Sequence, residues 1–141
     1  MQVSLNINDA KVSFIAFSNQ PNNPPKEPMK LEVEIGNSKN QQDDSANCFF
    51  VRFNISLFQK EENYLLNVVY TSFFTSNQTI DEEFFNSTFA KANAPSIAFP
   101  YLRAYISNIT MQSGYKPLLL QSINFIELSK DIKKIDPLKE T

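Results

Sequence analysis

The sequence predicts a single α+β domain, in which a four-stranded antiparallel sheet is followed by two or three helices packed on one face. Apolar and polar residues alternate with a period of two up to residue 75, and helical spacing replaces that period from residue 79 onward. The length of 141 residues suits one domain. We therefore expect one domain over residues 1–141, with the sheet in residues 1–75 and the helical layer in residues 79–135.

The first strand is expected at residues 3–17. Apolar residues occupy every second position there in two runs, namely Val3, Leu5 and Ile7, then Val12, Phe14 and Ala16. The phase shifts between the runs, near residues 8–11, which a β-bulge or a tight bend would explain. Residues 19–25 contain three prolines and are expected to form a loop, because proline cannot donate a hydrogen bond to a strand ladder.

Three more strands complete the predicted sheet. Residues 29–35 alternate apolar and charged side chains, which is typical of a half-buried strand, and the polar stretch at residues 36–47 is expected to be a loop. Residues 48–58 and 64–75 form the third and fourth strands. The short polar turn between these two strands predicts that they form an antiparallel hairpin.

The predicted sheet has apolar side chains on both faces. Phe50, Phe58, Val69 and Phe73 fall on the face that the alternation assigns to solvent. A sheet that is apolar on both faces needs helices or a partner over the second face.

Two helices are expected after the sheet. The acidic residues 81–83 open a short helix, where they suit the helix dipole, and Pro95 ends it. A longer helix is expected at residues 97–113, with Ser96 as its N-cap and Gly114 as its left-handed C-cap. Its apolar stripe consists of Ile97, Tyr101, Tyr105 and Ile109, widened by Leu102 and Ile106.

The remaining chain is expected to run extended through residues 116–120. A last amphipathic helix is then predicted from the spacing of Leu128, Ile132 and Ile135, and it should end before Pro137.

Composition argues against several classes of function. The net charge of −2 offers no basic surface for nucleic acid. Histidine is absent and Cys48 is the only cysteine, which excludes Ser–His and Cys–His catalysis and ordinary zinc sites. The paired carboxylates at residues 43–44, 61–62 and 82–83 are interpreted as solvated turns and a helix cap. We therefore expect no enzyme, no cofactor and no metal.

The compartment is expected to be the cytoplasm, without membrane insertion. The first nine residues lack a secretory signal pattern, and no window is apolar enough to span a bilayer.

The aromatic content is high, with 13 Phe and 5 Tyr. One interpretation is a large core with oligomer contacts. The other is a surface with aromatic grooves that accept apolar segments of other proteins, since aromatic surfaces bury much area without a fixed hydrogen-bond pattern. Composition alone leaves both interpretations open.

Two sequence motifs carry a resemblance to a known family. Residues 94–103, with the sequence APSIAFPYLR, and residues 114–125, with the sequence GYKPLLLQSINF, resemble two motifs of the export chaperone SecB in the family's order and separation. The positions that match in the first motif and one helical turn later are Pro95, Ile97, Phe99, Pro100, Tyr101, Arg103 and Ile106.

The resemblance implies a tetramer built as a dimer of dimers, with the sheets outward and the long helices between dimers. Unfolded or precursor polypeptides would lie in apolar grooves between the sheet and the helical layer, and SecA or an antitoxin would be a further partner. The implied client-binding or assembly residues are Phe99, Tyr101, Ile106, Pro117, Leu118, Leu120 and Phe125. The implied structural residues are Pro95, Ile97, Pro100, Arg103, Gly114 and Asn124.

Within this set the resemblance assigns specific roles. Asn124 and Phe125 would anchor the start of a lid-like last helix, and Arg103 would make a structural bond at an interface or to helix-end carbonyls. The function implied is an ATP-independent holdase. The alternatives are a dedicated chaperone of a toxin–antitoxin system on the same fold and a structural oligomer without clients.

Overall fold

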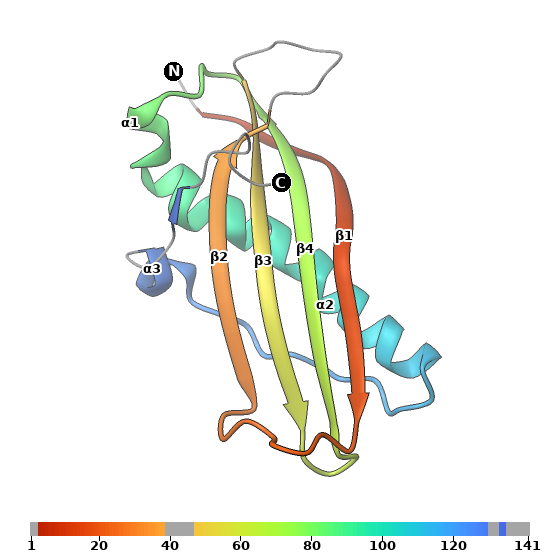
Figure 1. The fold of residues 1–141 in the computed structure, drawn as a ribbon. Coiled ribbons are helices and arrows are strands. Elements are labelled where there is room, and N and C mark those ends of the chain that lie inside the picture. Colours follow the sequence, from red (N-terminus) through yellow and green to blue (C-terminus); the bar gives the residue numbers. More distant parts are fainter. Residues whose placement is uncertain (1–2, 39–46, 130–132, 135–141) are drawn as a thin grey trace.

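The computed structural model describes residues 3–38, 47–129 and 133–134. Its main element is a sheet in which four long antiparallel strands are joined at one edge by a two-residue parallel strand (Figure 1). The order across the sheet is β1-β4-β3-β2-β5. The strands are β1 (Leu5–Asn19), β2 (Met29–Asn37), β3 (Cys48–Gln59), β4 (Tyr64–Ser76) and β5 (Lys133–Lys134). The predicted four-stranded antiparallel sheet is confirmed, and β5 adds to it.

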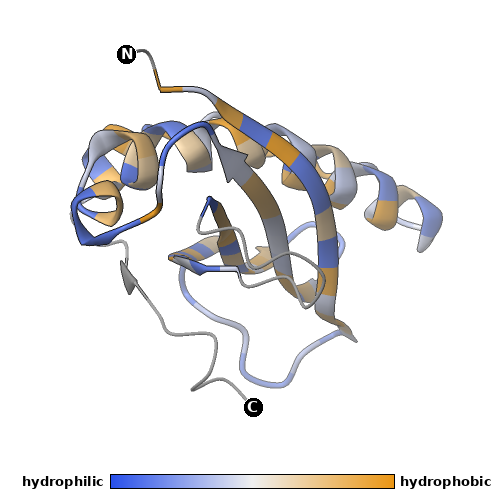
Figure 2. Cartoon of the chain, turned by 90° about the horizontal axis from the view of Figure 1, so that it is seen from above, coloured by the Kyte–Doolittle hydropathy of each residue, from blue (hydrophilic) through white to orange (hydrophobic). Residues whose placement is uncertain are grey.

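Helices cover one face of this sheet, which we call the inner face. The elements are α1 (Glu82–Phe85), the π-helix η1 (Phe89–Asn93), α2 (Ala94–Gln112) and α3 (Phe125–Leu128). The long helix α2 crosses behind the strands in Figure 1, and Figure 2 shows it running along one side of the curved sheet. The predicted order of sheet followed by helices is confirmed.

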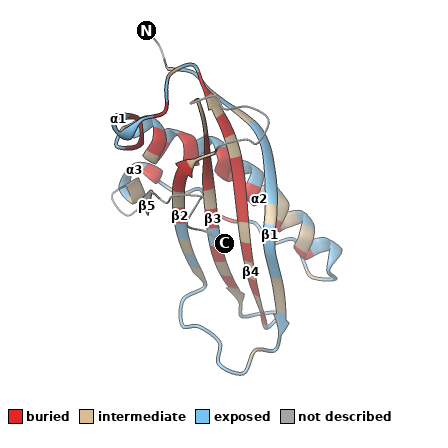
Figure 3. Cartoon of the chain, turned by 45° about the horizontal axis from the view of Figure 1, so that its top comes forward, coloured by how far each residue is buried: buried red, intermediate tan, exposed pale blue. Residues whose placement is uncertain are grey.

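The hydrophobic core lies between the inner face and α2. Directly paired side chains of β3 and β4 are buried there, including Phe49 opposite Phe74 and Ile55 opposite Val68. Leu102 of α2 closes the core from the other side. Figure 3 shows the buried residues concentrated in β3 and β4, whereas β1 is mainly exposed.

Strand β1 contains two register shifts, although the sequence predicted one. The first lies between Ile7 and Asp9, in the expected region, and the second lies between Val12 and Phe14. Each extra residue reverses the face that the following side chains occupy. Phe14 therefore pairs with Val69 on the outer face, and the expectation that it shares a face with Val12 is wrong.

No helix among the described residues covers the outer face of the sheet. Apolar side chains pair there across β3 and β4, Phe50 with Phe73 and Phe58 with Leu65, and the predicted apolar character of this face is therefore found. Phe50 is 3% exposed, and the guanidinium carbon of Arg52 lies 4.8 Å from its ring centre. The outer face is therefore a mixed surface in which aromatic rings lie beside a charged group.

The long helix begins earlier than the sequence predicted. The π-helix η1 leads directly into α2, and Pro95 lies in the first turn of α2 without ending the helix. Ser96 lies inside the helix, and its Oγ donates to the Ala92 carbonyl at 2.7 Å. The expectations that Pro95 ends a helix and that Ser96 caps one are therefore wrong.

The last helix is shorter than predicted. α3 ends at Leu128, and residues 133–134 form β5, which pairs with β2 opposite Glu34 and Ile35. A helix of four residues gains little from its own hydrogen bonds, and the unpaired edge of β2 offers a ladder partner instead. The predicted helix does not extend through residues 133–134; the predicted positions Ile132 and Ile135 lie outside the described residues.

Candidate functional site

The segment of residues 115–124 follows α2, and we call it the crossover. It begins at a well-defined helix end. Gly114 has a φ of 97°, as predicted for a left-handed C-cap. The Gly114 N–H donates to the Met111 carbonyl at 3.2 Å, and the Tyr115 N–H donates to the Thr110 carbonyl at 3.0 Å. This pair of bonds is a Schellman motif, which reverses the chain so that residues 115–124 return along α2.

Buried Thr110 fixes the returning chain to the helix. Its Oγ1 donates to the Ile106 carbonyl at 2.8 Å and accepts the Leu118 N–H at 3.0 Å. The Thr110 side chain is fully buried, so loss of either bond would leave a polar group without water.

The start of the crossover is also attached to the end of the sheet. The Tyr115 ring lies 4.2 Å from the Tyr64 ring and 5.6 Å from the Phe17 ring, measured between centroids. The Lys116 N–H donates to Glu62 Oε1 at 3.1 Å. Burial, and then the charge of Glu62 and the neighbouring Tyr115, raise the pKa of the Tyr64 hydroxyl.

The far end of the crossover is anchored in the core. Asn124 caps α3, its Oδ1 accepting the Ile126 N–H at 3.1 Å. The buried Phe125 ring contacts two core rings, at centroid distances of 5.3 Å to Phe99 and 6.1 Å to Phe53. The crossover is therefore an extended segment held at both ends.

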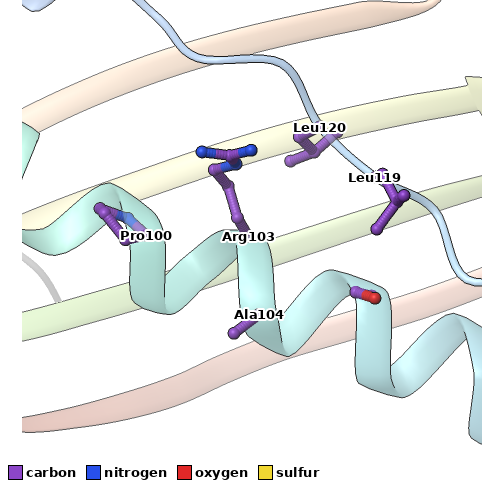
Figure 4. Close-up of a pocket in the computed structure, with 6 residues that line it drawn as sticks. Pro100, Arg103, Ala104, Leu119 and Leu120 are labelled. Carbon is purple, nitrogen blue, oxygen red and sulfur yellow. The ribbon is translucent and has the colours of Figure 1, made fainter.

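A pocket of about 260 Å³ lies between α2 and the middle of the crossover (Figure 4). It is lined by Pro100, Arg103, Ala104 and Ser107 from α2 and by Leu119 and Leu120 from the crossover. Leu119 is 78% exposed, whereas Leu120 is buried, because neighbouring residues of an extended chain point in opposite directions. The pocket is mainly apolar and has one charged lining residue, Arg103.

The structure divides the predicted site residues into three groups. Pro100, Arg103 and Leu120 meet at the pocket. Phe99, Ile106 and Phe125 lie inside the core, and Pro95 is buried in the first turn of α2. The residues on the exposed side of α2 or along the crossover and its ends are Ile97, Tyr101, Gly114, Pro117, Leu118 and Asn124.

Sequence reasoning missed Ala104, Ser107 and Leu119. Ala104 and Ser107 follow Pro100 by one and two helical turns, which places them on the same face of α2. Leu119 lies between two predicted residues in a segment that was predicted to be extended, but the sequence does not say which of its alternating side chains faces α2.

Arg103 is placed differently from the expectation of a structural bond. Figure 4 shows its side chain pointing from α2 toward Leu120 and the crossover. It makes no hydrogen bond or ion pair with any other described residue, so no bond to helix-end carbonyls is found within that part of the chain. A bond to a second copy of the chain stays a prediction.

Two further surfaces expose large apolar side chains. On α2, Tyr101 and Met111 are each 53% exposed. On β1, which pairs with β4 along one edge, Phe14 is 53% exposed on the outer face, and Ile15, opposite Val68, is exposed on the inner face.

Within residues 3–38, 47–129 and 133–134, no three His, Cys, Asp or Glu side chains are grouped so that they could hold a metal ion. The helices in this part of the chain also include none with the length and apolarity that crossing a membrane requires.

The antiparallel sheet, the helical layer on its inner face and the returning crossover define the fold of SecB-like chaperones. The chain belongs to the SecB family: the family described as "Preprotein translocase subunit SecB" matches residues 2–134. The resemblance seen in the two motifs is thereby confirmed over nearly the whole chain.

Individual proteins show the same similarity. The chain is 28% identical over 129 residues to the protein-export protein SecB of Paramagnetospirillum magneticum, which covers 89% of this chain and 76% of that protein. It matches the SecB-like chaperone Rv1957 of Mycobacterium tuberculosis, solved with a ChAD peptide from the HigA1 antitoxin, with a TM-score of 0.59 and 19% identity, over 84% of this chain and 87% of that one. A protein of unknown function from Streptococcus agalactiae matches with a TM-score of 0.58 and 12% identity, over 86% of this chain and 100% of that one.

Proposed function

We propose that this chain is an ATP-independent holdase that binds unfolded or pre-export polypeptides in the pocket between α2 and the crossover. Membership of a chaperone family supports the class of function. The observation that carries the proposal is the pocket itself, which is apolar, opens beside the exposed Leu119 and is bordered by a segment anchored at both ends.

The size of the pocket favours a side chain of a polypeptide over a free small molecule. Its volume of about 260 Å³ lies below the range of roughly 300–1,000 Å³ that is usual for small-molecule sites. Full burial of one leucine-sized side chain stabilises a complex by about 1.5–3 kcal/mol, which corresponds to binding weaker than about millimolar. One pocket therefore binds a client weakly, and useful affinity needs several pockets on one assembly.

We propose that a homotetramer, built as a dimer of dimers, supplies those pockets. The exposed side chains Tyr101 and Met111 on α2, Phe14 on the outer face of β1 and Ile15 on its inner face give a second copy apolar groups to cover. Phe99 and Ile106 support this assembly from the core side of α2. The proposed compartment is the cytoplasm, and SecA is a proposed partner of the assembled form.

Suppression of aggregation tests the proposed function. A chemically denatured test protein is diluted into buffer with and without the full chain, in the absence of nucleotide, and light scattering is followed. The proposal predicts that scattering falls as the chain approaches a stoichiometric amount. Unchanged scattering would leave a structural oligomer without clients as the better account.

A dedicated antitoxin chaperone is the second candidate. The observation that favours it is the fold similarity to Rv1957, which was solved with an antitoxin peptide. A toxin–antitoxin gene pair beside the gene for this chain would favour the dedicated role. Protection of many unrelated test proteins would favour the general role.

A further inference from the structure

A second pocket lies beside α1, and we call it the α1 pocket. Figure 1 shows α1 next to the start of β1, at the end of the sheet away from the β3–β4 turn. The α1 pocket has a volume of about 270 Å³ and shares no lining residue with the pocket between α2 and the crossover. Its lining comes from the chain before β1, the connection between β4 and α1, and the two short helices, and includes Val3, Gln78, Asp81, Glu83, Phe84 and Phe89.

Two phenylalanine rings line the apolar side of the α1 pocket. The Phe84 ring is almost fully buried and is held by edge contacts with Phe49 and Phe85, at centroid distances of 5.1 Å and 5.8 Å. Phe89 is 38% exposed and contacts no other aromatic ring within the described part of the chain. The face of an aromatic ring attracts a cation, because the ring carries negative charge above and below its plane.

Two carboxylates line the same pocket, and no lysine or arginine does. Asp81 Oδ1 accepts the Phe84 N–H at 2.8 Å, and this bond fixes the Asp81 carboxylate beside the pocket. Neither Asp81 nor Glu83 forms an ion pair with any described residue. The α1 pocket therefore combines aromatic rings with negative charge, and the described part of the chain supplies no cation to it.

We propose that the α1 pocket binds an arginine side chain of another polypeptide. A guanidinium is planar, so it can stack on an aromatic ring and donate two parallel N–H bonds to a carboxylate at the same time. In this arrangement the guanidinium stacks on Phe89, and Glu83 accepts its hydrogen bonds.

The size of the α1 pocket favours one side chain over a free ligand. Its volume lies below the range of roughly 300–1,000 Å³ that is usual for small-molecule sites. The proposal adds a binding site outside the pocket between α2 and the crossover, and it does not depend on the proposed holdase function.

Two peptides that differ by one charge test this proposal. One carries a single arginine in a sequence of glycine and serine, and the other carries citrulline, a neutral group of nearly the same shape, in its place. The full chain is labelled with ¹⁵N and titrated with each peptide, and the backbone amide shifts are followed by NMR. We expect saturable shifts at residues 79–89, with a dissociation constant about tenfold higher for citrulline, which lacks both the ion pair and the cation–π contact.

Two double variants separate the α1 pocket from the overall charge of the chain. Asp81→Asn with Glu83→Gln removes both carboxylates and keeps the helix cap, because asparagine caps a helix about as well as aspartate. The preference for arginine over citrulline should fall from tenfold to less than about twofold. Asp9→Asn with Glu27→Gln removes two exposed carboxylates outside the pocket and should leave the tenfold preference unchanged.

A single variant tests the aromatic contact. Phe89→Leu keeps an apolar side chain, which has no face that attracts a cation, and should weaken binding of the arginine peptide severalfold. Binding at wild-type strength by this variant would contradict the stacking on Phe89.

Three results would overturn the proposal. The first is equal affinity for the two peptides. The second is an equal loss of preference in the two double variants, because attraction to the overall charge would then account for the binding. The third is a set of shifts at residues 118–120 and none at residues 79–89, which would place the arginine at the other pocket.

The holdase function is measured separately from this site. The variant that combines Asp81→Asn with Glu83→Gln should suppress aggregation as well as the wild type does. Failure of the arginine site and failure of the proposed function are therefore read from different experiments.

Discussion

Thr110 and Leu118 are joined by a hydrogen bond of 3.0 Å in which the buried Thr110 Oγ1 accepts the Leu118 N–H. This bond connects the last turn of α2 to the crossover eight residues later. It sets the distance between the two walls of the pocket, because Leu119 and Leu120 follow directly.

Replacement of Thr110 by valine tests this connection. Thr110→Val keeps the shape of the side chain, removes the acceptor and should lower the free energy of unfolding by about 1–3 kcal/mol. Urea unfolding and hydrogen exchange of the Leu118 amide measure the two effects. Thr79→Val, an exposed threonine, is the matched control and should be neutral. Unchanged exchange at Leu118 in the Thr110 variant would show that the bond does not hold the crossover.

Removal of the pocket wall should reduce client binding without loss of stability. Leu119 is largely exposed, so Leu119→Ser should change the free energy of unfolding by less than about 0.5 kcal/mol. The affinity of the Leu119→Ser variant for an apolar peptide should fall severalfold, because the variant loses part of the contact that the leucine makes with the client. The control is Ile126→Ser, which removes an exposed apolar side chain outside the pocket. Equal peptide binding by both variants would place the client elsewhere.

Tyr64 carries a fully buried hydroxyl that has no hydrogen-bond partner within the part of the chain that the structure describes, although its ring is well packed. Tyr64→Phe should therefore be neutral or stabilise the chain by up to about 1 kcal/mol, because the hydroxyl no longer has to leave water. Tyr101→Phe at an exposed position serves as the control. Destabilisation of the Tyr64 variant beyond about 1 kcal/mol would mean that the hydroxyl is bonded in solution.

The raised pKa of the same hydroxyl predicts that the stability of the fold depends on pH. The folded state raises the pKa of Tyr64 above the ordinary value of 10.0, chiefly by burial and then through Glu62 and Tyr115. The stability linked to this group is therefore fully present below pH 10 and is lost as the pH rises from there through the folded pKa. Stability against urea should decline above pH 10 less steeply in Tyr64→Phe than in the wild type. Parallel curves would contradict this assignment.

Charges on the β1 surface should prevent assembly without unfolding the chain. Phe14 is exposed on the outer face, and a charge buried there between two copies would lack a partner. Phe14→Asp should lower the solution mass, whereas the control Asn6→Asp on the same strand should not. A Phe14→Asp variant with the mass of the wild type would remove β1 from the proposed interface.

Phe99 tests the placement of α2 in the core. Its ring lies 5.8 Å from Phe53 and 5.3 Å from Phe125, and it is almost fully buried. Phe99→Asp buries an unpaired charge and should unfold the chain or abolish assembly and client binding together. A variant with unchanged mass and unchanged client binding would refute this placement.

The strands were predictable because each carries a local signal. Alternation located β2, β3 and β4 to within a few residues, and the first bulge of β1 was visible as a change of phase. The second bulge was not, because Phe14 and Ala16 continue the pattern of Val12 while the backbone reverses their direction.

The site was less predictable because it depends on the path of the crossover. The resemblance gave Pro100 and Arg103 as structural residues and Leu120 as a client-binding or assembly residue, and it did not predict that the three line one pocket. Their meeting depends on the Schellman turn at Gly114 and on the Thr110 bond, which bring together segments far apart in sequence. The prediction of a last helix was wrong over residues 133–134, because the apolar spacing beyond Leu128 carries no information about the open edge of β2.

Solution mass by light scattering, with and without a permanently unfolded polypeptide, tests the central claim most directly. The account predicts a tetramer of about four times 16.2 kDa that gains mass when the polypeptide is added without nucleotide. A monomer or dimer whose mass is indifferent to the polypeptide would contradict the holdase and leave the SecB fold without its proposed function.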